Sequence, residues 1–221
     1  SFHVTGVQTC ALPIFRAGAG MDYRRPRTAS LERPGVPIPE DEMRVYLLRH
    51  GETAWNVEGR IQGQLDIPLS DTGRRQAVSW SRFFESIPLA AVYSSSLSRA
   101  AETAKLATGR VPIEMPELNE RYFGDFQGQV WRRELETVLD FTPPGGESRD
   151  QLENRVRLGM EKIVSQHGAT DAVVIVAHGG SSRVALSLAG ADPKLLGNAS
   201  LATLDYESGK WTVHSIRPWD A

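Results

Sequence analysis

From residue 43 onward, short apolar runs alternate with longer amphipathic stretches. The runs 44–49, 90–95, 111–115 and 172–177 are mostly β-branched, aromatic or small apolar residues, which is typical of buried strands. The stretches 69–86, 97–108 and 148–167 repeat apolar residues at helical spacing. Segments 200–206 and 210–216 flank Ser208-Gly209 and predict a closing β-hairpin. The pattern therefore predicts an α/β fold, a three-layer α/β/α sandwich with a mostly parallel central sheet.

The helical stretches also carry signals for their ends and their buried faces. Ser70 is the expected N-cap of the first helix, and Gly168 the expected C-cap of the last one. Three sets of residues are expected to face the core: Ala77, Trp80, Phe84 and Ile87; Leu97, Ala101, Ala104 and Thr108; and Leu152, Val156, Met160 and Ile163.

Composition limits the classes of partner. The chain is 40% hydrophobic and 24% charged with a formal net charge of −2, so no overall basic field predicts binding to nucleic acid or to an anionic membrane. An anion-binding site must therefore be local. No apolar run approaches the about 20 residues of a membrane span, and no secretion signal is evident. Cys10 is the single cysteine and cannot form an internal disulfide, which fits a reducing, cytoplasmic location.

The N-terminal part differs in character from the rest. The segment "VTGVQTCALPI", Val4 to Ile14, resembles the in-frame translation of a sequencing-library adapter, so residues 1–15 are interpreted as an artefact; a frayed tail is the alternative. Residues 16–42 combine arginines and prolines without helical or strand periodicity, which predicts a disordered leader. We therefore expect the folded domain to comprise residues 43–221.

Chemically reactive side chains follow several of the predicted strands. Arg49-His50-Gly51 ends the first strand and His178-Gly179-Gly180 ends the run 172–177, while Arg99 and Glu120 follow the second and third strands. The carboxyl ends of parallel strands meet at one sheet edge, where ligands bind in open α/β sheets. Two imidazoles, two guanidiniums and one carboxylate would form a cationic pocket suited to a phosphate group.

Six ordered motifs carry a resemblance to a known family. They are "LLRHGETAWN", "GQLDIPLSDTGRRQA", "SSSLSRAAETA", "LNERYFGDFQG", "PPGGES" and "AHGG". In this order they resemble the histidine phosphatase superfamily, also called phosphoglycerate mutase-like, from about Met43 to the end of the chain. The resemblance implies a nucleophile, His50; a proton donor, Glu120; and phosphate or substrate ligands, Arg49, Asn56, Gln62, Gly63, Arg99, His178 and Gly179.

The chemistry fits these residue types. A neutral imidazole is a competent nucleophile near pH 7, and its phosphoramidate is labile enough for water to hydrolyse it. Arginines and His178 can neutralise the phosphate charge without a metal, and Glu120 can protonate the departing alkoxide. Asp125 lies near enough in sequence to compete for the acid role. Asn56 and Gln62 could equally cap a loop instead of touching a ligand.

Three functions are compatible with these residues and motifs. The first is a metal-independent phosphoric monoester hydrolase of the histidine acid phosphatase type that acts on a small phosphorylated metabolite without a cofactor. The second is a phosphoglycerate mutase. The short segment between "GDFQG" and "PPGGES" offers only Arg132 and Arg133 in place of the long basic insertion of cofactor-dependent mutases, and Phe123 stands where those mutases usually place a tyrosine. A non-catalytic phosphate-binding module is the third. The sequence indicates no oligomeric state.

Overall fold

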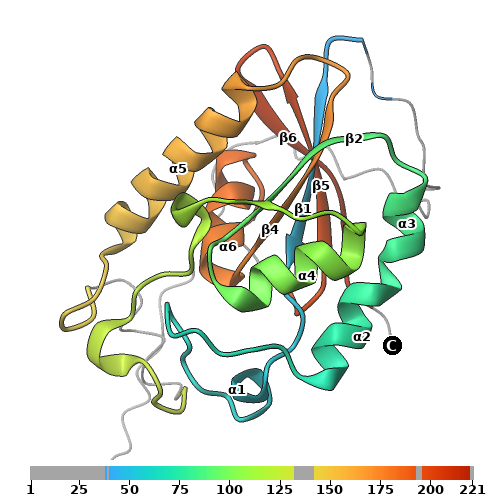
Figure 1. The fold of residues 1–221 in the computed structure, drawn as a ribbon. Helices are drawn as coiled ribbons and strands as arrows, with labels where there is room; N and C mark the ends of the chain where they lie inside the picture. Colours follow the sequence, from blue (N-terminus) through green and yellow to red (C-terminus); the bar gives the residue numbers. More distant parts are fainter. Residues whose placement is uncertain (1–37, 39, 132–141, 193–195, 220–221) are drawn as a thin grey trace, which may run out of the picture. The chain divides into compact units, whose positions relative to one another are not determined.

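A six-stranded sheet with the order β3-β2-β4-β1-β5-β6 forms the centre of the computed structural model (Figure 1). The structure describes residues 38, 40–131, 142–192 and 196–219, all within the unit Glu32–Ala221. The strands are β1 (Met43–Arg49), β2 (Leu89–Ser94), β3 (Ile113–Glu114), β4 (Ala172–Ala177), β5 (Leu201–Glu207) and β6 (Lys210–Arg217). β1 to β4 pair in parallel, whereas β5 is antiparallel to both β1 and β6, so the sheet is mixed and mostly parallel.

Helices cover both faces of this sheet. They are α1 (Ala54–Val57), α2 (Asp71–Ser79), α3 (Ser81–Glu85), α4 (Ser98–Thr108), α5 (Arg149–Ser165) and α6 (Gly179–Leu188), with short 3-10 turns at Pro116–Leu118 and Gly124–Phe126. One core cluster joins α5 and α6 to the sheet, and a second joins α3 and α4 to the opposite face. The predicted three-layer α/β/α sandwich is therefore confirmed.

The central strand β1 shows why two helical layers are needed. Val45 and Leu47 point into the core cluster on the α5/α6 side, while Tyr46 and Leu48 point into the cluster on the α3/α4 side. All four side chains are at most 5% exposed. Successive strand residues face opposite sides of a sheet, so an uninterrupted apolar run is stable only where both faces are covered.

Several local predictions are confirmed. Ser70 caps α2 by accepting a hydrogen bond from the Gly73 N–H, and the stripe on α5 from Leu152 to Ile163 is buried. The hairpin turns at Ser208 and Gly209, which have φ angles of 49° and 84°. These left-handed angles are typical of the tight turns that match the twist of paired strands.

Three local predictions are wrong. The helix expected over 69–86 breaks at Trp80, whose indole N–H donates to the Ala199 carbonyl at 2.8 Å. The helix α5 ends at Ser165 and its C-cap is Gln166, not Gly168. The buried face of α4 is formed by Arg99, Ala100, Thr103, Ala104 and Ala107. Ala101 and Thr108 were expected on that face but are only half-buried, because the buried face is centred on Ala100, Thr103 and Ala107.

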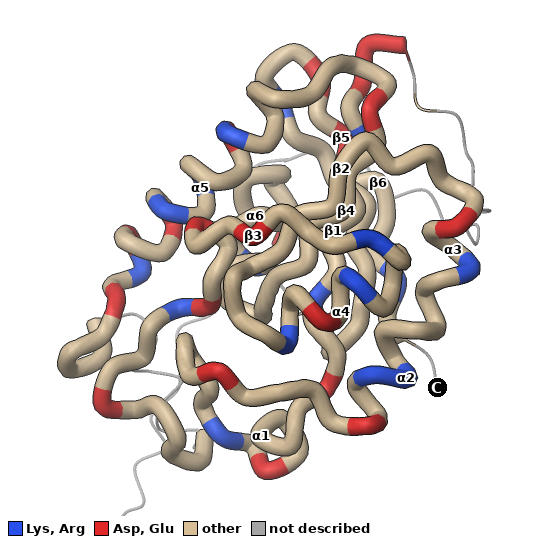
Figure 2. The backbone as a smooth tube through the Cα atoms, viewed as in Figure 1, with Lys and Arg blue, Asp and Glu red and all other residues tan. Residues whose placement is uncertain are grey.

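Predictions for residues 1–15, for most of 16–42 and for Arg132-Arg133 lie outside the described residues. Ile38 packs against the core cluster on the α3/α4 side, and β1 starts at Met43. No helix in the described ranges is long and apolar enough to cross a membrane. Figure 2 shows basic and acidic positions interspersed along the described chain. Any concentration of positive charge for an anion must therefore come from a local arrangement.

Candidate active site

Sheet register brings the two strand-end histidines together. β1 and β4 are parallel neighbours, with Arg49 paired opposite Ala177. The residues that follow each strand are His50 and His178, whose ring centroids are 5.0 Å apart. β2 lies on the other side of β4, and its continuation bonds back through the Ser95 N–H to the Val176 carbonyl. The histidines that follow the apolar runs 44–49 and 172–177 in the sequence therefore belong to one site.

His50 is held in a single orientation. Its Nδ1 lies 2.7 Å from the Gly51 carbonyl oxygen. Since a carbonyl only accepts hydrogen bonds, Nδ1 carries the hydrogen and Nε2 keeps its lone pair. Burial, and then the charges of Arg99 and Arg49, lower the pKa of His50 well below its ordinary value of 6.5. The result is a neutral imidazole with an available nucleophilic nitrogen.

His178 has the opposite tautomer. Its Nε2 lies 2.8 Å from Ser95 Oγ, and Ser95 Oγ donates its hydrogen to Asn119 Oδ1 at 2.8 Å. Ser95 must therefore accept from His178, which places the imidazole hydrogen on Nε2. The pKa of His178 is also well below 6.5, first through burial and then through the positive charges nearby. Within the described part of the chain, its buried Nδ1 has no hydrogen-bond partner.

Two arginines flank the histidines. Arg99 is 1% exposed and donates from Nη1 to the Leu65 carbonyl at 2.8 Å and from Nη2 to the Gly63 carbonyl at 2.7 Å. Burial lowers the pKa of Arg99 to about 10, so it remains charged at neutral pH. Arg49 donates from Nη1 to the Leu196 carbonyl.

In both guanidinium groups the inner nitrogen Nε, unlike Nη1, makes no hydrogen bond within the described part of the chain. Among the described residues, Arg49 Nε and Arg99 Nε are buried without a hydrogen-bond partner. Buried donors are rarely left unpaired, and such exceptions often mark a position that a ligand completes. Both guanidinium groups lie near enough to His50 for their charges to lower its pKa. The arrangement suits an anion bound next to the free nitrogen of His50.

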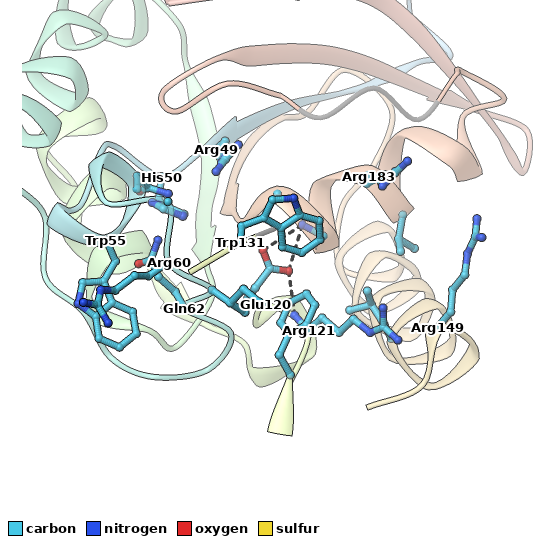
Figure 3. Close-up of a pocket in the computed structure, with 18 of the residues that line it drawn as sticks. Arg49, His50, Trp55, Arg60, Gln62, Glu120, Arg121, Trp131, Arg149 and Arg183 are labelled. Carbon is cyan, nitrogen blue, oxygen red and sulfur yellow. Dashed lines mark hydrogen bonds between the residues drawn. The ribbon is translucent and has the colours of Figure 1, made fainter. Parts of the chain in front are cut away.

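Glu120 approaches the same place from the turn after β3. The Gly180 N–H in the first turn of α6 lies 3.0 Å from both carboxylate oxygens, and the Arg121 N–H donates to Oε1 at 2.8 Å (Figure 3). A Cβ atom on Gly180 would stand 2.3 Å from Oε1, so only glycine permits this approach. Asp125 is exposed and is not among the residues that line the cavity described next, so the structure places Glu120 and not Asp125 beside the histidines.

A cavity of about 600 Å³ opens from His50 toward α5 and α6. Five arginines and two glutamates line it: Arg49, Arg60, Arg121, Arg149, Arg183, Glu120 and Glu153. Its wall also includes the aromatic residues Trp55, Phe123 and Trp131 and the aliphatic residues Ile61, Leu152 and Val184. Arg99 and His178 do not line this wall but lie buried behind it, beside His50. Within the described ranges, no group of three metal-binding side chains is placed to hold a metal ion.

Only some of the remaining predicted ligands lie in the cavity wall. Asn56, Gln62 and Gly179 line the cavity, whereas Gly63 does not. Asn56 also caps α1, since its Oδ1 accepts from the Thr53 N–H at 3.0 Å, so loop capping is one of its roles. Gly63 contributes its carbonyl to Arg99.

The Gly51 backbone stabilises the loop after β1 and does not offer its N–H to an anion. Its N–H donates to Thr103 Oγ1 at 3.0 Å, so this amide has a protein partner. A Cβ on Gly51 would lie 2.4 Å from the Gly73 carbonyl oxygen, so the residue lets the loop pack against α2.

Sequence reasoning missed several residues of the site. Ser95 fixes the tautomer of His178, and the serine run after β2 was the available signal. Arg183 on α6 and Glu153 on α5 also line the cavity, and neither was predicted as a site residue. Ser182 in α6 is fully buried, because α6 packs directly against the sheet and α5.

We expect both histidines to remain neutral at pH 6.5, with different tautomers. Their lowered pKa values mean that protonation requires a pH well below 6.5. Long-range ¹H–¹⁵N correlation spectra between pH 8 and 5.5 should show the hydrogen of His50 on Nδ1 and that of His178 on Nε2. Midpoints at or above pH 6.5, or the same tautomer for both rings, would contradict the hydrogen-bond assignment.

Comparisons with known proteins agree with this geometry. A family model described as the histidine phosphatase superfamily (branch 1) matches residues 45–217. A metal-independent phosphoserine phosphatase of Arabidopsis thaliana is 37% identical over 201 residues, which cover 81% of this chain and 83% of that protein. A mycobacterial glucosyl-3-phosphoglycerate phosphatase structure has a TM-score of 0.71 at 31% identity, covering 80% of this chain and 99% of that one. A phosphoglycerate mutase structure from Thermus thermophilus has a TM-score of 0.66 at 33% identity, covering 80% and 100%.

Proposed function

The chain belongs to the histidine phosphatase superfamily, and we propose that it is a metal-independent phosphomonoesterase that acts on a phosphorylated metabolite through a phosphohistidine intermediate. The observation that carries the proposal is the orientation of His50. Its Nδ1 hydrogen is bound to the Gly51 carbonyl, and its Nε2 lone pair is free beside two guanidinium groups with unpaired inner nitrogens. A nucleophile and the charge that neutralises a phosphate dianion therefore occupy the same place.

In the first step, His50 Nε2 attacks phosphorus and the bond to the leaving oxygen breaks. Arg49 and Arg99 offset the charge on the phosphoryl oxygens. A phosphate dianion also favours protonation of His178 at Nδ1, which would turn that buried nitrogen into a donor. Glu120 supplies a proton to the departing alkoxide, which leaves as an alcohol.

In the second step, water attacks the phosphoryl group on His50. The nitrogen–phosphorus bond breaks, inorganic phosphate leaves, and the imidazole regains its lone pair. Glu120, now ionised, is placed to accept a proton from that water by microscopic reversibility. The two displacements together hydrolyse one phosphomonoester and regenerate every protein group.

The acid phosphatase type is the finer part of the proposal. It is supported by the lowered pKa of His50, because a group with a depressed pKa keeps its nucleophilic, neutral form as the pH falls below 6.5. Burial in the wall beside cationic side chains is the cause of that shift. Turnover is therefore expected to persist into mildly acidic solution.

A phosphoglycerate mutase is the second candidate, because a solved phosphoglycerate mutase shares this fold at 33% identity. Hydrolysis and isomerisation share the first step and differ in whether water or a second substrate oxygen receives the phosphoryl group. His50 lies in the wall of a cavity of about 600 Å³ with many charged side chains, which has room for water beside the phosphorylated histidine, and this favours hydrolysis.

The test offers 3-phosphoglycerate and catalytic 2,3-bisphosphoglycerate to the enzyme in the presence of a chelator. We expect inorganic phosphate or no reaction, with 2-phosphoglycerate formed at least about 100-fold more slowly than an aryl phosphate is hydrolysed. Phosphate release by colorimetry and isomer ratios by ³¹P NMR measure the two outcomes. Rapid isomer exchange with little free phosphate would replace the phosphatase assignment with the mutase one.

A further inference from the structure

The cavity is much larger than a phosphate group needs. Cavities of roughly 300–1,000 Å³ hold whole drug-sized ligands, and this one measures about 600 Å³. Figure 3 shows Arg149 and Arg183 on the side of the cavity away from Arg49 and His50, with Glu120 and Trp131 between them. The outer part, formed by α5 and α6, is therefore available to the leaving group of a substrate.

Most charged side chains of the cavity wall beyond Arg49 and Glu120 already have protein partners. Arg60 pairs with Glu58 at 2.5 Å and donates to the Gly128 carbonyl. Arg121 donates to the Glu147 carbonyl at 2.9 Å and stacks over Phe123. Arg149 likewise has a partner.

Arg183 and Glu153 are different. Both are exposed to the cavity, Arg183 from α6 and Glu153 from α5. Neither makes an ion pair or hydrogen bond with any residue in the described part of the chain, and they do not pair with each other. Two opposite charges that share a cavity without neutralising one another are complementary to a ligand with both an anionic and a cationic group.

We propose that the outer cavity is a subsite for a zwitterionic leaving group of the α-amino acid type, with its carboxylate at Arg183 and its ammonium at Glu153. The inference rests on the proposed phosphatase function and names its substrate class. Aromatic and aliphatic side chains, among them Trp131, Leu152 and Val184, line the same cavity. A leaving group with an apolar part between its phosphate and its charged groups is therefore complementary to this wall.

Four aryl phosphates test the subsite at nearly constant leaving-group reactivity. O-Phosphotyrosine carries both charges, phosphorylated 3-(4-hydroxyphenyl)propionate only the carboxylate, phosphorylated tyramine only the ammonium, and 4-ethylphenyl phosphate neither. We expect kcat/KM to be about 10-fold higher for each charge added, as hydrogen bonds to charged groups at a partly exposed site allow.

Two variants assign the charges. Arg183→Gln should remove the advantage of the carboxylate and leave that of the ammonium, and Glu153→Gln should do the reverse. Neither should change 4-ethylphenyl phosphate by more than about 2-fold. Arg157→Gln and Glu161→Gln are matched controls, because this ion pair lies on the same helix α5 and neither residue lines the cavity.

The outcomes separate the subsite from the activity. Hydrolysis of all four aryl phosphates at similar rates, or equal losses on every substrate in both variants, would overturn the subsite while the phosphatase function stands. If 4-ethylphenyl phosphate is not hydrolysed at all, the proposed function fails. Calorimetric binding of the matching non-hydrolysable phosphonates then tests the subsite alone: tighter binding of the zwitterion, lost in both variants, supports it, and equal binding overturns it.

Discussion

Replacing His50 by alanine should lower kcat for phosphomonoester hydrolysis by on the order of 10⁴-fold or more, because the variant lacks the nucleophile of the first displacement and hence the phosphohistidine that water hydrolyses in the second. The remaining arginines still bind the phosphate, so KM should change far less than kcat. A phosphoramidate is stable in base and labile in acid. Alkaline quenching of the wild-type enzyme with ³²P-labelled substrate should therefore trap label on the protein, and none should be trapped on the variant.

Controls for this experiment separate lost chemistry from lost folding. His50 is only 3% exposed, so its truncation leaves a cavity that could cost about 2–5 kcal/mol of stability. His50→Gln fills more of that space and should be equally inactive. His214 lies in the edge strand β6 and does not line the cavity. His214→Ala should therefore keep full activity. Label retained on the His50 variants would mean that another residue is the nucleophile.

Glu120→Gln should slow alkyl phosphates by on the order of 10²–10⁴-fold and activated aryl phosphates by less than about 10-fold. The amide oxygen can keep the hydrogen bonds from Arg121 and Gly180, so the substitution removes the transferable proton with little change of shape. A good leaving group needs no proton to depart, whereas an alkoxide does. The slope of log kcat/KM against leaving-group pKa should therefore become steeper in the variant.

Asp125→Asn is the matched control for this prediction. Asp125 is the other carboxylate of the same motif, but it is exposed and outside the cavity wall. The variant should retain the wild-type dependence on leaving-group pKa. If Glu120→Gln slows aryl and alkyl phosphates equally, Glu120 is not the general acid and serves only to hold the first turn of α6.

The sequence by itself determined the elements and the inner site residues. Uninterrupted apolar runs such as 172–177 can only be stable between two helical layers, so the pattern predicted the α/β/α sandwich. Capping is equally local: Ser70 lies directly before the helix whose N–H groups it satisfies. Reactive residues directly after apolar runs were predicted to meet because parallel strands end at the same sheet edge.

Only the tertiary structure decided how these residues are used. The tautomer of His178 depends on the hydroxyl of Ser95, which is 83 positions away in sequence, and that of His50 depends on the backbone conformation that brings the carbonyl of the next residue, Gly51, to its Nδ1. The lowered pKa values of both histidines depend on burial beside Arg49 and Arg99. Arg183 and Glu153 were not predicted as site residues, because it is the packing of α5 against α6 that brings both to the cavity. Hydrophobic periodicity is a local property of the chain, whereas hydrogen-bond partners, burial and charge proximity are set by segments far apart in sequence, and so they follow only from the folded arrangement.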